Sequence, residues 1–132
     1  MDLDKQRILI TGGGVRVGRA LSLAFARAGA EILIHYRTSS DEAEETAERI
    51  RTAGGKADTV CGDLAKAAGP AAIMEQALAK GPLHGLINNA AVFRRTPLAE
   101  SDRQTFLDEF GPNLLGPLEL LRAFAAQTDR GV

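Results

Sequence analysis

The chain has 132 residues, about the size of one domain, and its 45% hydrophobic and 25% charged residues are typical of globular proteins. Its 16 basic and 17 acidic residues give a formal net charge of -1, which argues against nucleic acid as a partner and gives no support for electrostatic membrane binding. No apolar run is long enough to cross a membrane, and the single cysteine, Cys61, allows no internal disulfide, so we expect a cytoplasmic protein without membrane contact.

Strand-like and helix-like stretches alternate along the chain. The β-branched run at residues 7–11 stops at a glycine, as a buried strand does, and the apolar period then changes to that of a helix. We expect strands at residues 7–11, 31–36, 56–62 and 83–90, and helices at residues 16–28, 41–53, 66–79 and 101–127. This alternation predicts one α/β domain over residues 1–132, with a parallel sheet and helices on both faces.

Local signals add detail to three of the helices. The first is expected to bury one apolar stripe, formed by Val17, Leu21, Ala24, Phe25 and Ala28. Ser39 with Glu42, and Ser101 with Gln104, have the spacing of a helix capping box. Gly-Pro pairs within residues 111–117 predict a kink in the last helix, or two shorter helices.

Three consecutive glycines, Gly12 to Gly14, separate the first strand from the first helix. Glycine lets the backbone approach a phosphate closely, and a helix N-terminus adds N–H groups and a partial positive charge. Gly12 would allow the tight turn, and Gly18 the close packing of helix on strand. We interpret the turn as a phosphate-binding site; the alternative is a plain connection between two elements.

The second predicted strand ends in "HYRTS", residues 35–39. Dinucleotide-binding folds often place an acidic residue there, which accepts hydrogen bonds from the adenosine ribose. Here Arg37 offers a guanidinium group, Thr38 and Ser39 offer hydroxyls, and Arg16 could reach the same point from the first turn. These groups suit a 2′-phosphate, so the pattern favours NADP(H) over NAD(H). The alternative is that Arg37 is a solvated loop charge and Ser39 only a helix cap.

Four motifs follow one another along the chain. "TGGGVRVG" has the pattern Thr-Gly-x-x-x-Gly-x-Gly, with Arg16 in place of the middle glycine. Asp63 and Leu64 follow the third strand, "NNAA" ends with Ala91, and Asn113 stands in "NLLGP". In this order and spacing the motifs strongly resemble the short-chain dehydrogenase/reductase family. The arginine is similar to that of the family's pteridine-reductase branch, which favours NADPH.

The resemblance implies a Rossmann-type, doubly wound sheet with strand order 3-2-1-4 and an NADP(H) site. The implied cofactor-binding residues are Gly12, Gly14, Arg16, Val17, Gly18, His35, Arg37, Thr38, Ser39, Asp63, Leu64, Asn89, Ala90 and Ala91. It also implies that the backbone of Asn113 holds a water of the catalytic proton relay. Phe93 would stack on a bound pterin as substrate, the alternative being a loop anchor.

The resemblance covers only the N-terminal half of a typical family member. The family's serine and Tyr-x-x-x-Lys pair lie beyond it, and the chain's one tyrosine, Tyr36, stands on the second strand. Because a catalytic acid must lie within hydrogen-bond reach, we expect the chain alone to be inactive. The apolar strand at residues 83–90 would also lie at a sheet edge, so we expect a homo-oligomer or pairing with a missing C-terminal half.

Two functional hypotheses follow. The first is an NADPH-dependent reductase that moves hydride to the carbonyl, or the pterin-like C=N bond, of a small molecule. The second is a non-catalytic nucleotide-binding module or a truncated fragment. No metal site is expected, because His35 and His84 lack partners at metal-ligand spacing. His35 either lines the adenosine pocket or lies at the surface, and Cys61 is expected to be a small buried residue.

Overall fold

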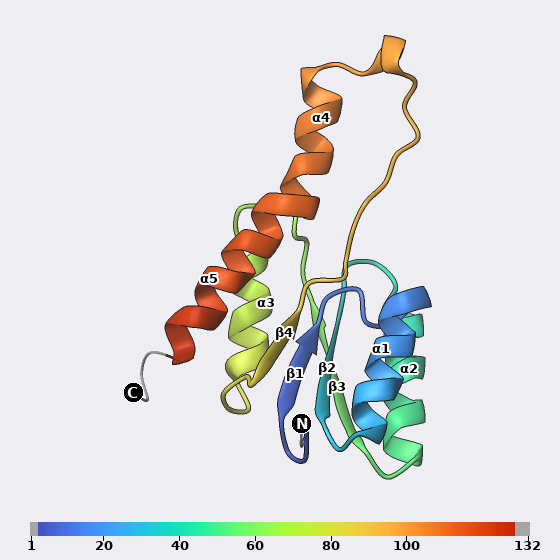
Figure 1. The fold of residues 1–132 in the computed structure, drawn as a ribbon, viewed down its shortest axis with the longest axis vertical. Coiled ribbons are helices and arrows are strands. Elements are labelled where there is room, and N and C mark those ends of the chain that lie inside the picture. Colours follow the sequence, from blue (N-terminus) through green and yellow to red (C-terminus); the bar gives the residue numbers. More distant parts are fainter. Residues whose placement is uncertain (1–2, 129–132) are drawn as a thin grey trace.

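A computed structural model describes residues 3–128 as one sheet with helices on both of its faces (Figure 1). The four strands are all parallel and lie in the order β3-β2-β1-β4, which confirms the predicted Rossmann-type topology. The strands are β1 (Arg7–Ile10), β2 (Glu31–Tyr36), β3 (Lys56–Cys61) and β4 (Gly85–Ile87). The helices are α1 (Arg16–Arg27), α2 (Ser40–Thr52), α3 (Gly69–Leu78), η1 (Leu98–Glu100), α4 (Arg103–Phe110), η2 (Gly111–Leu115) and α5 (Gly116–Thr128).

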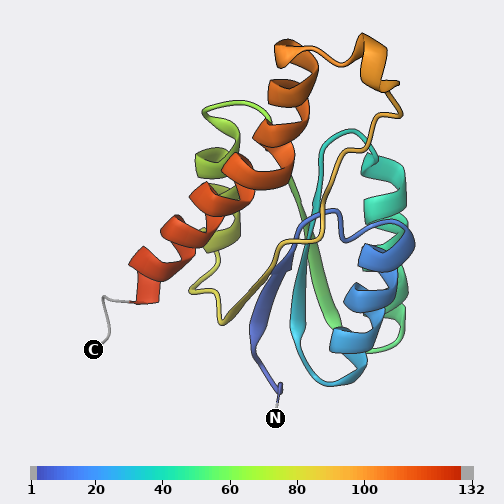
Figure 2. The same cartoon turned by 45° about the horizontal axis from the view of Figure 1, so that its top comes forward.

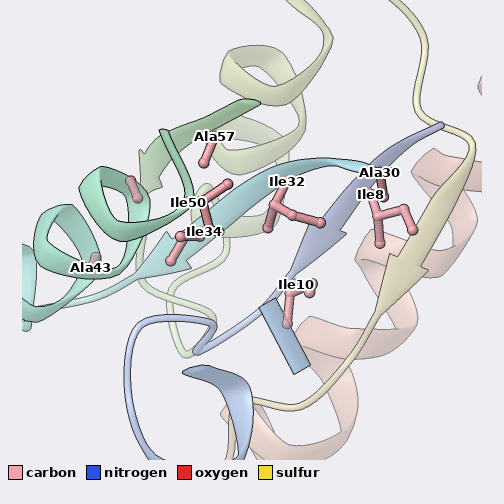
Figure 3. Close-up of a cluster of buried hydrophobic side chains, with 9 residues drawn as sticks. Ile8, Ile10, Ala30, Ile32, Ile34, Ala43, Ile50 and Ala57 are labelled. Atoms are coloured by element: carbon pink, nitrogen blue, oxygen red, sulfur yellow. The ribbon is translucent and has the colours of Figure 1, made fainter. Parts of the chain in front are cut away.

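The two central strands, β1 and β2, bury both of their faces, which is why their sequences are almost continuously apolar. On one face, isoleucines of β1 and β2 pack under α2 in a cluster that includes Ile34, Ala43 and Ile50 (Figure 3). On the other face, Leu9 and Leu33 pack with residues of α3 and α5. Figure 2 shows the same division, with α1 and α2 on one side of the sheet and α3 and α5 on the other.

The apolar stripe predicted for α1 is partly wrong. Leu21 and Phe25 do pack against the core, but Val17 is 65% exposed and Ala24 and Ala28 are also exposed. The reason is that the N-terminal part of α1 packs against the glycine turn. Its buried residues there are Gly18 and the small polar Ser22. Apolar period alone does not identify such a contact.

Both predicted capping boxes are wrong. Ser39 occupies the N-cap position of α2, but its side chain makes no capping hydrogen bond. In α4 the cap is Asp102 rather than Ser101, and its carboxylate accepts from the N–H of Thr105 at 2.8 Å and from the hydroxyl of the same residue. These two donors lower the pKa of Asp102. At the start of α2, the hydroxyl of Ser39 is not used as a cap and so is available to a ligand.

Two other boundaries differ from expectation. Helix α3 begins at Gly69 instead of residue 66, because residues 63–69 form turns in which the Asp63 carboxylate accepts from the N–H of Ala65. Strand β4 ends at Ile87, because the next N–H groups of the chain bond to the Thr11 hydroxyl instead of a neighbouring backbone. The predicted break in the last helix is confirmed as a π-helical turn, η2, which contains Pro112.

Cys61 is exposed, so its expected burial is also wrong. It is the last residue of β3, where the sheet gives way to the turn that carries Asp63. Among the residues that the structure describes, no helix is both long and apolar enough to cross a membrane.

Candidate functional site

A cavity of about 400 Å³ lies at the carboxyl ends of the strands, where ligands bind in open parallel sheets. Every residue predicted to bind the cofactor lines it, although the sequence places these residues in four separate segments. Four further lining residues were not predicted: Val15, Tyr36, Val92 and Pro112. Each of these adjoins a predicted residue or, for Pro112, the predicted Asn113, so proximity in sequence was the signal that could have found them.

The turn between β1 and α1 is built for glycine. Gly12 has a φ of +63°, in the left-handed region that favours glycine. A Cβ on Gly18 would lie 1.9 Å from the carbonyl oxygen of Gly12, and one on Gly14 would lie 2.7 Å from the Cα of Ala43. The backbone therefore passes closer to α1 and α2 than any other residue type would permit.

Side chains outside the turn hold its carbonyl groups. The hydroxyl of Ser22 donates to the oxygen of Gly13 at 2.8 Å. The oxygen of Gly14 accepts from Arg19 Nε at 2.9 Å and from the hydroxyl of Thr46 at 3.0 Å. With these carbonyls bonded to α1 and α2, the unbonded N–H groups at the start of α1 lie at the cavity, as an anion requires.

Arg16 has an unusual backbone, because its φ of +47° lies in the left-handed region although it carries a full side chain. That conformation costs a non-glycine residue about 1 kcal/mol. Within residues 3–128 its guanidinium has no hydrogen-bond or ion-pair partner, and the same holds for the guanidinium of Arg37, which lines the same cavity. Both arginines, with Thr38, are exposed.

His35 lies beneath the glycine turn and is only 2% exposed. Its Nδ1 accepts from the N–H of Gly12 at 3.2 Å, and its Nε2 lies 2.9 Å from the carbonyl oxygen of Gly62. Burial lowers the pKa of His35, more strongly than the Gly62 carbonyl and the Asp63 charge raise it. The open question of its placement is thereby decided, because His35 is buried and lines the cavity.

The segments that follow the two edge strands, β3 and β4, also line the cavity. Asp63 is partly exposed, with one carboxylate oxygen used in its own turn, and Leu64 is buried. The Thr11 hydroxyl accepts from the N–H groups of Asn89 and Ala90 at 2.9 and 3.0 Å, while the Asn89 amide donates to the oxygen of Thr11 at 2.9 Å. Thr11, which was not predicted as a site residue, thus ties the end of β4 to the glycine turn.

Asn113 and Phe93 are placed differently from the cofactor residues. The side-chain amide of Asn113 exchanges two hydrogen bonds, each of 2.8 Å, with the backbone of Val92, and so it joins the π-helical turn to the segment after β4. Phe93 is 87% exposed and is not among the residues that line the cavity. Their predicted roles, in the proton relay and in substrate stacking, stay predictions.

Tyr36, the one tyrosine of the chain, lines the cavity from the end of β2. Burial raises its pKa, and the nearby Cys61 and Glu44 raise it further. A raised pKa makes a phenol a weaker acid, whereas general acid catalysis is favoured by a pKa near the operating pH. Within residues 3–128 no group of three or more His, Cys, Asp or Glu side chains is arranged to hold a metal ion.

Comparison with known proteins agrees with this geometry. The family model for short chain dehydrogenases matches residues 6–131. An uncharacterized oxidoreductase of Mycobacterium tuberculosis is 42% identical over 113 residues, which are 85% of this chain and 43% of that protein. The short-chain dehydrogenase/reductase homolog YusS of Bacillus subtilis is 37% identical over 99 residues, which are 74% of this chain and 90% of that protein.

Solved structures show the same likeness. The angucycline C-6 ketoreductase LanV with bound NADP has a TM-score of 0.87 and 26% identity, with 95% of this chain and 51% of LanV covered. The alternative dihydrofolate reductase FolM of Brucella canis, complexed with NADP, has a TM-score of 0.87 and 30% identity, with 95% of this chain and 50% of FolM covered. Apart from YusS, the chain thus spans about half the length of these relatives. Its fold, its glycine turn and the matched residues establish that the chain belongs to the short-chain dehydrogenase/reductase family.

Proposed function

We propose that this chain is the NADP(H)-binding half of a short-chain reductase that transfers hydride to a small-molecule carbonyl or a pterin-like C=N bond. The observation that carries the proposal is the pair of guanidinium groups, Arg16 and Arg37, which line one cavity without a partner in the described chain. A reductase of this family is expected to be cytoplasmic, which agrees with a single, unpaired cysteine.

The two arginines suit a 2′-phosphate. Such a group carries a charge near −2 and accepts several hydrogen bonds, which planar guanidinium groups donate in pairs. The hydroxyls of Thr38 and Ser39 lie at the same wall, and that of Ser39 is not used as a helix cap. The ribose of NAD(H) would offer these arginines no negative charge, so the site favours the phosphorylated cofactor.

The remaining lining residues fit the rest of the cofactor. The N-terminus of α1 faces the cavity and offers N–H groups to the pyrophosphate. Asp63, Asn89, Ala90 and Ala91 also line the cavity. Asp63 would accept a hydrogen bond from the adenine, and the other three would contact the ribose side. When bound, the nicotinamide supplies the hydride. The role of this chain is to hold the nucleotide. Asn113 contributes by fixing the segment after β4 through its two hydrogen bonds to Val92.

The group that donates the proton to the substrate is proposed to lie outside these 132 residues. The chain contains no Tyr-x-x-x-Lys sequence, and Tyr36 has a raised pKa. We therefore propose that the 132 residues bind NADP(H) without turning over substrate, and that a C-terminal half completes the reductase. A pterin substrate is supported by Arg16 and by the likeness to FolM, and Phe93 would be its stacking partner.

The test is a titration of the chain with NADPH and NADH, followed by assays with carbonyl and pterin substrates. Arg37→Ala should weaken NADPH binding about tenfold, because it removes charge-assisted hydrogen bonds, and should leave NADH binding unchanged. Arg27→Ala is the matched control, since it removes the same charge from the exposed last turn of α1. Unchanged NADPH preference in Arg37→Ala would refute the phosphate assignment.

A second candidate is a nucleotide-binding module that has no catalytic partner. The match to YusS favours it, because that match covers 90% of a curated relative and so shows that family members of similar length occur. The two candidates differ in one result. Adding a separately produced C-terminal half of a relative restores turnover only if the chain is the half of a reductase.

A further inference from the structure

We propose that His35 is a positioning residue for the cofactor turn: a single neutral tautomer holds Gly12 through Nδ1 and Gly62 through Nε2, and NADP(H) binding weakens when the ring takes up a second proton. The inference rests on the proposed function, since it concerns binding of that cofactor.

The partners of the ring determine its tautomer. The Gly12 N–H, 3.2 Å from Nδ1, can only donate, so Nδ1 carries no proton. The Gly62 carbonyl oxygen, 2.9 Å from Nε2, can only accept, so Nε2 carries the proton. In the other neutral tautomer, a protonated Nδ1 would face the Gly12 N–H, so two donors would meet. The unprotonated Nε2 would face the Gly62 carbonyl oxygen, so two acceptors would meet.

These contacts join three segments of the site. Gly12 opens the glycine turn after β1, and Gly62 immediately precedes Asp63 after β3. The backbone of His35 adds a third contact, because its carbonyl oxygen accepts from the N–H of Gly13 at 3.2 Å. The ring therefore sets the distance between the turn proposed to bind the pyrophosphate and the segment proposed to bind the adenine.

A second proton would break this arrangement at the turn. A protonated Nδ1 would point its hydrogen at the Gly12 N–H, so that an acceptor becomes a donor and the turn loses its support. Asp63 is the charge that favours the protonated ring, whereas burial disfavours it more strongly. Arg16, Tyr36 and Arg37 are further ionisable residues that line the same cavity, and Cys61 ends the neighbouring strand β3. The remaining ionisable residues on the adjacent elements are Arg7 on β1, Glu31 on β2, Lys56 and Asp58 on β3, and Arg19 and Arg27 on α1.

The first experiment measures the tautomer in the cofactor-free chain. Long-range proton–nitrogen correlation spectra distinguish a protonated from an unprotonated ring nitrogen. We expect Nε2 to be protonated and Nδ1 unprotonated at about pH 8, where a histidine is ordinarily neutral. The opposite tautomer, or a mixture of both, would overturn the proposal. This result depends neither on cofactor binding nor on a variant that has to fold.

The second experiment compares two variants for NADP⁺ affinity at about pH 8. His35→Asn keeps an acceptor near the position of Nδ1 but loses the donor to Gly62, and it should lose less NADP⁺ affinity than His35→Gln. His35→Gln keeps a donor near the position of Nε2 but leaves the partly buried Gly12 N–H without an acceptor, and should bind about tenfold more weakly than the original chain. Equal affinities, with both variants folded by circular dichroism, would contradict the role assigned to Nδ1.

The pH profile completes the test. A 2′-phosphate itself titrates near pH 6, so some loss of NADP⁺ affinity in acid is expected for any variant. His35→Asn reports that loss alone, and the original chain should lose further affinity as the pH falls. Superimposable profiles would overturn the linkage. If the original chain bound no NADP⁺ at any pH, the proposed function would fail and the cofactor part of this inference with it, whereas the tautomer would still test the positioning part.

Discussion

Arg16 occupies a left-handed backbone position where the family motif has glycine, and it does so beside the turn that we propose binds the pyrophosphate. A conformation that costs about 1 kcal/mol is kept where a site needs the side chain. The side chain in question is a guanidinium with no partner in residues 3–128, at the cavity entrance. Stability and cofactor choice are therefore expected to oppose each other at this residue.

Arg16→Gly should raise the free energy of unfolding by up to about 1 kcal/mol, because glycine adopts this conformation without strain. The same variant should lose preference for NADPH over NADH. Urea unfolding and cofactor titration measure the two effects. Arg27→Gly is the control, since glycine within a right-handed helical turn should instead destabilise by about 1 kcal/mol. A less stable Arg16→Gly would show that the strain argument is wrong.

His35 makes stability depend on pH. Its pKa in the folded chain is lowered, so as the pH falls the unfolded chain takes up the proton first. At pH values above the ordinary histidine pKa of about 6.5, the free energy of unfolding should have its full value. As the pH falls from there toward the lower pKa of His35 in the folded chain, the free energy of unfolding should decrease. Urea unfolding at several pH values, with His35→Asn as reference, measures this. Parallel pH curves for the two proteins would contradict it.

At the scale of elements, β1 supports the end of α3. The Arg7 guanidinium donates to the carbonyl oxygens of Ala77, Gly81 and Pro82, and it lies 3.8 Å from the Glu31 carboxylate. These acceptors include carbonyls that the end of a helix leaves unbonded. One side chain therefore joins the start of the sheet to α3 and to the segment before β4.

Arg7→Met keeps much of the side-chain volume but leaves those carbonyls without a donor. We expect the free energy of unfolding to fall by about 2–3 kcal/mol, the cost of leaving buried polar groups unpaired. Arg49→Met, at an exposed position of α2, should change it by less than about 0.5 kcal/mol. Chemical denaturation compares the two. An equal decrease in the free energy of unfolding for the two variants would mean that the hydrogen bonds of Arg7 contribute little to stability.

At the scale of the whole molecule, α4, η2 and α5 together leave a set of six large apolar side chains exposed. We call it the α4–α5 apolar face, and it consists of Phe106, Leu107, Leu114, Leu115, Leu118 and Leu121. Strand β4, which in residues 3–128 pairs only with β1, adds an open sheet edge. Exposed apolar area and an open edge both favour association. Our proposal that the chain self-associates, or pairs with a C-terminal half, rests on these two features.

Sedimentation velocity should therefore show concentration-dependent association of the chain. Leu118→Glu combined with Leu121→Glu should shift the distribution toward the monomer, because burying carboxylates in an apolar contact is costly. Leu98→Glu is the matched control, since Leu98 is 91% exposed and lies outside this face. A monomer at all concentrations for the original chain would refute self-association.

Sequence reasoning succeeded where the signal is local or is a known motif. The alternation of apolar strands and glycine-ended helices predicted a parallel α/β sheet, and the motifs predicted the strand order that the structure has. The residues predicted to bind the cofactor share one cavity, although their binding role stays a prediction. Helix caps were harder, because Ser101 and Asp102 are both good N-cap residues and only the backbone conformation distinguishes them.

The sequence by itself thus determined the sheet, its two buried faces and the set of residues around the cavity, since apolar period and glycine spacing are properties of neighbouring residues. Only the tertiary structure decided how those residues are held. The ring of His35 obtains its tautomer from partners 23 and 27 positions away, and Asn113 bonds a backbone 21 positions away. The physical reason is that hydrogen-bond partners and burial depend on which segments meet in space, and no local pattern encodes that.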